Sequence, residues 1–181
     1  MFSCERVTHS MNTSLLRPFT REEIYTALSQ MHPTKVPGSD GMSALFFQKY
    51  WHIVGDQVTA AILDCLNGGS FLSKINFTHI VLIPKTQCPE DMAHFRPISL
   101  CNVVYKIVAK VLANRLKIVL PHVISESQSA FVPERLITDN VLVSYELNHY
   151  LKWKNWGKTG FVSLKLDMSK AYDRMECEYL K

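Results

Sequence analysis

Residues 161–174 constrain the fold of this chain more than any other stretch. Val162, Leu164 and Leu166 alternate with the residues at 161, 163 and 165, which is the period of a β-strand, and Asp167 follows at once. The pattern predicts a strand over 161–167 that carries the Asp167 carboxylate to one edge of a sheet, and a helix from Ala171 onward. The rest of the chain then has to supply a sheet for that strand.

Two roles fit Asp167. Its carboxylate can cap the helix that follows, and the pattern alone favours this role because strand–Asp–helix junctions are common in α/β proteins. A carboxylate on a rigid strand end can also hold a divalent cation beside a phosphate, since hard cations take oxygen ligands. Tyr172, five residues on, would return an aromatic ring to the same place.

Composition limits the class of protein. The 181 residues are 47% apolar, about the length of one domain, without a run of the ~20 apolar residues that a membrane span needs. Five cysteines without a C-x-x-C pair favour a reducing compartment, so we expect an intracellular protein, nuclear or cytoplasmic and not secreted. The whole net charge of +4 arises after residue 84, a mild excess that by itself is usually only a solvated surface.

The first half predicts helices. Residues 1–18 show no periodicity and are expected to be poorly ordered. Thr20 and Glu23 form a capping box that starts a helix, which Pro33 ends. A turn-rich loop follows at 35–41, then helices over 43–51 and 54–66, the second ending at Gly68 and Gly69. The aromatic residues at 46, 47, 50 and 51 are assigned to the core.

Residues 78–84 and 95–100 are two β-rich runs joined by a polar connection, and they predict an antiparallel pair. Lys85 and Arg96 lie near its ends. Lys binds phosphate as a point charge and Arg as a planar fork, but two exposed basic residues at strand ends are an equally good interpretation of the pattern.

Residues 103–119 give the clearest helix, which Pro121 is expected to end. One side is apolar (Val104, Ile107, Val108, Val111, Leu112, Leu116), and Lys106, Lys110 and Lys117 share another. Such a basic flank is either solvated or a source of phosphate contacts beside a nucleic-acid channel. A last helix is predicted over 140–152, with Val143, Leu147, Tyr150 and Leu151 facing inward.

Several blocks, in this order, resemble the reverse transcriptases of LINE-type (non-LTR) retrotransposons in the form typical of plant genomes. Residues 35–41 resemble that family's K-x-P-G-x-D-G segment, residues 83–85 and 95–103 its fingers hairpin, and residues 165–174 its first catalytic motif. Residues 128–140 match Q-S-A-F-V-P-G-R-L-I-T-D-N except that Glu134 replaces Gly. If that Gly needs a positive φ or a close approach to nucleic acid, Glu134 brings strain and repulsion. Cys177 replaces a Trp and is expected to change packing only.

The resemblance implies an α+β fold: the fingers and first palm strand of a right-hand polymerase, truncated before the rest of the palm and the thumb. It divides the chain into an N-terminus (1–18), a helical N-terminal extension (19–75) and the N-terminal part of the reverse transcriptase domain (76–181). The implied activity is RNA-directed DNA polymerisation by two-metal nucleotidyl transfer. Its cofactor would be Mg²⁺ or Mn²⁺, and its partners an RNA template, a DNA primer and deoxynucleoside triphosphates, with no membrane.

The same resemblance assigns site residues. Asp167 is the catalytic carboxylate and a metal ligand, the Met168 backbone carbonyl is a further metal ligand, and Tyr172 excludes a ribose 2′-OH. Lys85 and Arg96 bind the nucleotide triphosphate. Template or primer contacts are expected from residues on the helix and the segment after it (Lys106, Lys110, Gln128, Arg135).

Two metals need further carboxylates, which this family takes from an F/Y-A-D-D hairpin downstream. The sequence contains no Asp-Asp pair, so we expect the chain alone to be inactive. Three hypotheses follow: a polymerase fragment that works only with its missing half, a non-catalytic nucleic-acid-binding remnant, and a product that does not fold stably.

Overall fold

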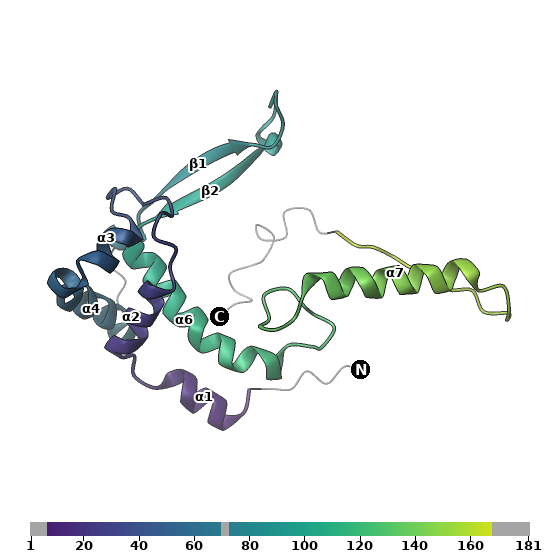
Figure 1. The fold of residues 1–181 in the computed structure, drawn as a ribbon, viewed down its shortest axis with the longest axis horizontal. Helices are drawn as coiled ribbons and strands as arrows, with labels where there is room; N and C mark the ends of the chain where they lie inside the picture. The colour runs from purple at the N-terminus through teal and green to yellow at the C-terminus, as the bar shows by residue number, and fades with distance from the viewer. Residues whose placement is uncertain (1–6, 70–72, 168–181) are drawn as a thin grey trace. The chain divides into compact units, whose positions relative to one another are not determined.

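The computed structural model describes residues 7–69 and 73–167. The chain forms two compact units, residues 1–128 and residues 129–181, which are considered separately below (Figure 1). Six helices and one hairpin are described in the first unit: α1 (His9–Leu16), α2 (Arg21–Ser29), α3 (Ala44–Lys49), α4 (Trp51–Gly68), α5 (Ser73–Asn76), β1 (Thr78–Pro84), β2 (Phe95–Cys101) and α6 (Val103–Val123). The second unit holds α7 (Ile137–Trp153).

Local sequence signals set the ends of the helices. The predicted capping box is formed: the Glu23 N–H donates to the Thr20 hydroxyl, and the Thr20 N–H donates to the Glu23 carboxylate at 3.0 Å. The long helix α4 ends at Gly69, which adopts a φ of +70°, a conformation that only glycine reaches without strain. Both predictions are confirmed.

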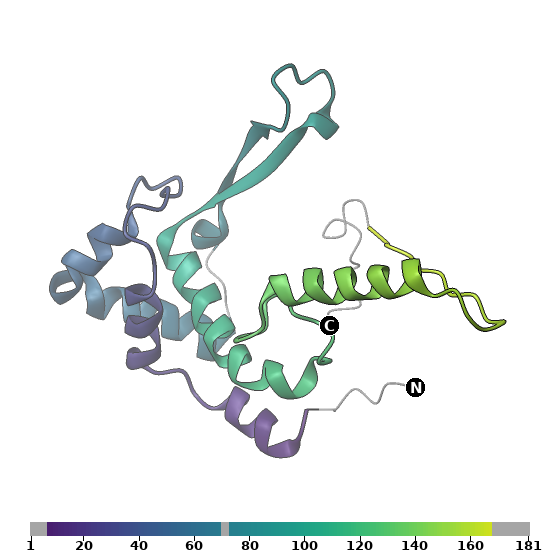
Figure 2. The same cartoon turned by 45° about the vertical axis from the view of Figure 1, so that its right-hand side comes forward.

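A single core holds the first unit together. Helices α2, α3 and α4 pack around α6, as Figures 1 and 2 show from two directions. The core residues are aliphatic apart from one aromatic ring (Ile24, Ala27, Leu28, Ala44, Phe47, Ile62, Val103, Ile107, Val108, Val111). Phe46 and Trp51 pack against this cluster, so the assignment of the aromatic group to the core is confirmed for three of its four members, while Tyr50 stays 38% exposed.

A buried charge also ties the unit together. The Arg115 side chain is 5% exposed and forms a bidentate pair with Glu23, in which both N–H···O distances are 2.8 Å. Its guanidinium stacks 3.5 Å from the centroid of the Phe19 ring and donates to three backbone carbonyls before α2 (Leu15, Arg17, Pro18). The Arg115 hydrogen bonds to Glu23 lower the pKa of Glu23 from its usual 4.5 to about 2. The hydrogen bond from the Thr20 N–H lowers it as well, and burial of the carboxylate opposes the effect.

Helix α6 differs from its prediction in two ways. It runs through Pro121 to Val123, because a proline in the last turn removes only one backbone hydrogen bond at a point where the ladder is ending anyway. The buried side of α6 also differs from the apolar stripe that was predicted for it. Leu112 and Leu116 are about half exposed, and Arg115 lies on the buried side because the capped start of α2 supplies its partners.

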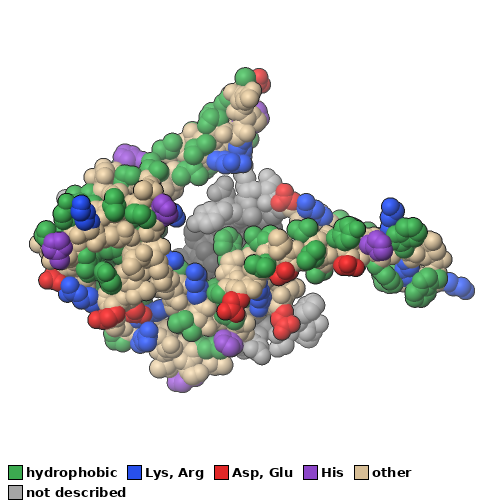
Figure 3. Space-filling view, viewed as in Figure 1, with side chains coloured by type: hydrophobic (Ala, Val, Ile, Leu, Met, Phe, Trp, Pro, Cys, Tyr) green, Lys and Arg blue, Asp and Glu red, His purple; other side chains and the backbone are tan. Residues whose placement is uncertain are grey.

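The hairpin is formed as predicted. Strands β1 and β2 are antiparallel, with Thr78 opposite Cys101 and Pro84 opposite Phe95. Apolar side chains on the two strands remain exposed (Ile80, Val81, Leu82, Ile83, Ile98). Figure 3 shows hydrophobic side chains, in green, along the hairpin.

In the second unit, α7 forms but does not bury the predicted side. No residue of α7 is fully buried, and Val143, Leu147 and Tyr150 are 67%, 47% and 49% exposed. The prediction that these three face inward is wrong for the described residues, because an apolar stripe is buried only where another element covers it. Leu151, the fourth residue of the prediction, is half-buried.

The predicted strand over 161–167 is also absent. Residues 161–167 have no ladder partner in the described part of the chain, and Val162, Leu164 and Leu166 are 91%, 75% and 83% exposed. A strand exists only when a neighbouring strand accepts its hydrogen bonds, and the described residues supply none here. The predicted helix after Ala171 lies outside the described residues.

Among the described residues, three short elements were not predicted: α1, α5 and a 3₁₀ helix over Met92–His94. Helix α1 begins at the N-cap Thr8, whose hydroxyl accepts from the Met11 N–H at 3.3 Å, although none of its residues is buried. The proposed boundary between residues 75 and 76 stays a prediction, and helices from both sides of it share the one core.

Candidate nucleotide and nucleic-acid interface

The hairpin presents its two basic residues on one face. Arg96 lies opposite Ile83, and the Lys85 N–H donates to the His94 carbonyl at 2.7 Å, which continues the ladder by one step. Residues two apart on a strand share a face, so Lys85 and Arg96 lie on the same side as diagonal neighbours. Both side chains are exposed, and the Lys85 ammonium donates to the Ala93 carbonyl at 2.8 Å.

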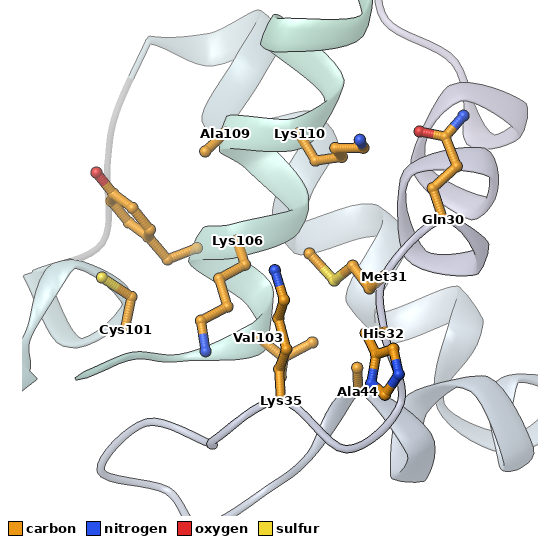
Figure 4. A pocket seen from close by; sticks show the side chains of 11 residues that line it. Gln30, Met31, His32, Lys35, Ala44, Cys101, Val103, Lys106, Ala109 and Lys110 are labelled. Atoms are coloured by element: carbon orange, nitrogen blue, oxygen red, sulfur yellow. The ribbon is translucent and has the colours of Figure 1, made fainter. Parts of the chain in front are cut away.

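A second group of basic side chains surrounds a pocket of about 530 Å³ beside the first half of α6. Lys106 and Lys110 come from α6, and His32 and Lys35 come from the chain between α2 and α3. Figure 4 shows Lys35 reaching from the loop into the space beside the helix. None of the eleven residues that line the pocket is acidic.

The loop over residues 35–41 is fixed to the start of α6. A Cβ on Gly38 would lie 2.5 Å from the backbone N of Asn102 and 2.7 Å from its Cα, so only glycine permits this approach. The Lys106 ammonium donates to the Val36 carbonyl at 2.8 Å. The sequence predicted a turn-rich loop here and a resemblance to the K-x-P-G-x-D-G segment, but no contact partner for the loop. The Gly38 signal was present in the sequence, but its contact partner lies 64 residues away and only the fold identifies it.

The segment between α6 and α7 contains two residues with positive φ, Phe131 at 64° and Glu134 at 66°. Glu134 stands at the Gly position of the motif that residues 128–140 resemble, and its backbone is left-handed, the conformation that was expected to bring strain in a residue with a Cβ. The neighbouring Arg135 is half-buried. Gln128, at the end of the first unit, is exposed, and its N–H donates to the Ser125 carbonyl at 3.1 Å.

Asp167 is the last described residue and its side chain is exposed. Its carboxylate is the kind of ligand that Mg²⁺ takes. Among the described residues, no group of three or more His, Cys, Asp or Glu side chains gathers to hold a metal, so the described part of the chain does not build the two-metal site around Asp167. Met168 and Tyr172 lie outside the described residues.

Of the helices that the structure describes, none has both the length and the apolar character that crossing a bilayer requires. Lys85 and Arg96 are exposed on the hairpin. Lys35, Lys106 and Lys110 line the pocket, where Lys35 is exposed and the other two are half-buried. Clustered basic side chains of this kind are expected of a protein that binds polyanions.

Comparison with known proteins supplies the family. Residues 83–180, just over half of the chain, match the family described as Reverse transcriptase (RNA-dependent DNA polymerase). The chain belongs to this family. Over 176 residues it is also 35% identical to a Xenopus laevis protein called "Transposon TX1 uncharacterized 149 kDa protein", a match that covers 96% of this chain and 13% of that protein.

Proposed function

We propose that this chain is the front portion of a retrotransposon reverse transcriptase domain, whose complete form is an RNA-directed DNA polymerase. The observation that carries the proposal is the family match over residues 83–180 together with the similarity to a transposon protein over 96% of the chain. The form of the motifs at 95–103 and 128–140 supports a place in the LINE-type group found in plants. In this proposal the hairpin belongs to the fingers of a right-hand fold. Residues 161–167, which have no strand partner among the described residues, become the first strand of its palm only when the rest of the palm supplies one.

The hairpin is the proposed nucleotide clamp. A triphosphate carries several negative oxygens, and Lys85 and Arg96 offer two cationic groups on one face of a rigid ladder. The Lys85 ammonium has three N–H groups, of which the Ala93 carbonyl takes one, so two donors remain.

Asp167 is the proposed catalytic carboxylate, with the Met168 carbonyl as a second oxygen ligand and Tyr172 as the group that excludes a ribose 2′-OH. When bound, Mg²⁺ or Mn²⁺ supplies the charge that neutralises the attacking and leaving oxygens. One described carboxylate does not suffice for that chemistry, and the sequence has no Asp-Asp pair. We therefore propose that the 181-residue chain does not polymerise by itself.

The RNA template and DNA primer are the proposed macromolecular partners. Lys106, Lys110, Gln128 and Arg135 are the proposed contacts, and they act on the backbone of the nucleic acid without regard to sequence.

A primer-extension experiment tests the proposal. Two proteins are compared on an RNA template with Mg²⁺ or Mn²⁺: the 181-residue chain, and a longer chain in which it is followed by the rest of a palm and thumb. The longer chain should extend the primer and lose extension on Asp167→Ala, whereas the shorter chain should be inactive. Extension by the 181-residue chain that depends on Asp167 would overturn the proposed division of the site.

The hairpin has its own test in the longer chain. Arg96→Ala should raise the KM for nucleotide by about 10- to 100-fold, because a charge-assisted phosphate contact contributes roughly 1.5–3 kcal/mol. Lys49→Ala, an exposed lysine on α3, is the matched control. A KM that Arg96→Ala leaves unchanged would remove the clamp from the proposal.

A second function, binding without catalysis, is favoured by one observation. The first unit has a hydrophobic core and a basic pocket, while the described residues gather no group of three or more His, Cys, Asp or Glu side chains that could hold a metal. A longer chain that binds RNA but extends no primer would select this function.

A further inference from the structure

The pocket beside α6 combines charge and apolar surface in one concave site. Its cationic members are Lys35, Lys106 and Lys110, with His32 at the edge of the loop, and none of the described residues that line the pocket is acidic. Its apolar members include Met31, Val103 and Ala109. Figure 4 shows both kinds of side chain around the same space.

Two contacts fix the loop that carries Lys35 against the start of α6. Lys106 donates one of its three N–H groups to the Val36 carbonyl, which fixes the loop that carries Lys35 and leaves the remaining N–H groups available. The Gly38 contact with Asn102 fixes the same loop from the other side. The Lys106 ammonium and the backbone of the loop that carries Lys35 therefore stand at set positions.

The backbone adds to the positive potential. Cys101 and Val103, at the start of the 21-residue helix α6, line the pocket, and the N-terminal end of a helix carries the positive end of its dipole. The Asn102 side chain accepts from the Ser39 hydroxyl at 3.4 Å and makes no capping bond, so it does not occupy the first-turn N–H groups.

The size and lining indicate the kind of anion. A pocket of about 530 Å³ is far larger than a bare phosphate needs and lies in the range of small-molecule sites. An apolar wall is of no use to an inorganic anion, but it can cover the face of a nucleobase.

We propose that this pocket takes one nucleotide of a single-stranded nucleic acid, with its phosphate on Lys35 and Lys110 and its base against the apolar wall. The choice of nucleic acid over other phosphorylated ligands rests on the proposed function. Lys106 is a positioning residue because it holds the loop that presents Lys35. Ala109 lies on the wall and is exposed, which makes it a position where the pocket can be filled without changing its charge.

The test measures binding of a fluorescein-labelled U₁₀ RNA to the 181-residue chain by anisotropy between 0.05 and 0.3 M salt. Each phosphate contact to a single strand contributes about 0.7 to the slope of log K against log salt. Lys35→Gln/Lys110→Gln should make the slope shallower by about 1.4, which corresponds to binding roughly 25-fold weaker at 0.1 M salt. The control Lys49→Gln/Lys152→Gln removes the same charge from exposed positions on α3 and α7 and should change binding far less. Equal losses in the two double variants would overturn the proposal.

A second variant separates a nucleotide from a bare anion. Ala109→Phe fills the apolar side of the pocket and should weaken U₁₀ at least fivefold while leaving the binding of inorganic polyphosphate unchanged. Unchanged U₁₀ binding would exclude a base in the pocket and overturn the proposal.

Lysine acetylation of the parent chain gives a readout that needs no variant. Bound U₁₀ should protect Lys35 and Lys110 and leave Lys49 reactive, whereas equal protection of all three would overturn the site. None of these measurements involves Asp167 or primer extension. Failure of the pocket is therefore distinguishable from failure of the polymerase proposal.

Discussion

The two units of the chain carry similar apolar helices and use them in opposite ways. In the first unit, α6 buries Ile107 and Val111 completely or almost completely, while in the second unit α7 leaves Val143 and Leu147 67% and 47% exposed. Both helices were predicted from the same kind of apolar stripe. The difference teaches that a stripe specifies a helix, whereas burial requires a second element to cover it.

The family match and the hydrophobic core begin at different residues of the chain. The match begins at residue 83, yet α6, which lies within it, packs on α2, α3 and α4, which lie before it. The helices at the N-terminus are therefore part of the core of the matched segment. The similarity to the Xenopus laevis transposon protein spans 96% of this chain and so includes them.

The largest effect is expected where the first unit depends on a buried charge. Arg115→Met should lower the free energy of unfolding by about 3–5 kcal/mol, because it removes both Arg115 hydrogen bonds to Glu23 and leaves three backbone carbonyls without the Arg115 donor. Urea denaturation followed by circular dichroism measures the change. Arg21→Met, which breaks the exposed pair with Asp56, is the control and should cost no more than about 1 kcal/mol. Equal effects of the two substitutions would show that the Arg115 network does not hold the unit together.

The same network predicts a pH dependence. The pKa of Glu23 is about 2 in the folded chain and about 4.5 in the unfolded chain, so its contribution is fully present above pH 4.5 and is lost as the pH falls from 4.5 toward 2. The loss should reach about 3 kcal/mol below pH 2, and about 2 kcal/mol of it should occur between pH 6 and pH 3. Denaturation at pH 6 and pH 3 measures it, and Glu23→Gln should flatten the dependence while Glu126→Gln should not. A parent chain equally stable at both pH values would contradict the prediction.

A matched pair of valines tests the contrast between the helices directly. Val111→Ala should destabilise by about 2–3 kcal/mol, because the side chain is 1% exposed and its removal leaves a cavity. Val143→Ala, at a side chain that is 67% exposed, should change stability by no more than about 0.5 kcal/mol. A large loss from Val143→Ala in the denaturation midpoint would mean that α7 is covered in solution.

The loop at residues 35–41 provides a smaller effect. Gly38→Ala should cost about 1–3 kcal/mol, since its Cβ has no room beside Asn102. Gly68→Ala, where a Cβ would meet nothing within 4 Å, is the control. The U₁₀ affinity should fall with Gly38→Ala as well, because the displaced loop carries Lys35. A variant with parental stability would show that the loop is not fixed by this contact.

The smallest effect is expected in the second unit. Glu134→Gly should stabilise the segment around it by about 0.5–1 kcal/mol, because glycine relieves the strain of a φ of +66° but loses more freedom on folding. Hydrogen exchange of the amides at 129–140 should slow by about two- to fivefold. Glu126→Gly, at a position without positive φ, should not slow exchange. Faster exchange in Glu134→Gly would show that the glutamate is not strained in solution.

Local patterns predicted much of the first unit. The capping box of α2, the end of α4 at Gly69 and the antiparallel hairpin all follow from residues close to one another in the chain. Patterns that needed a distant partner failed. Arg115 was not predicted to be buried because its partners lie about 90 to 100 residues away, and Gly38 was not linked to Asn102 for the same reason.

By itself, the sequence determined the type of the longer helices and of the two hairpin strands, and the motifs that lead to the reverse transcriptase family, because helix caps, turns and strand periods are short-range signals. Only the tertiary structure decided which apolar sides are covered, that Lys35 joins Lys106 and Lys110 around one pocket, and that residues 161–167 have no strand partner within the described part of the chain. The physical reason is that burial, ladder bonds and the gathering of like charges around a cavity are properties of pairs of elements. A periodic pattern reports on one element at a time.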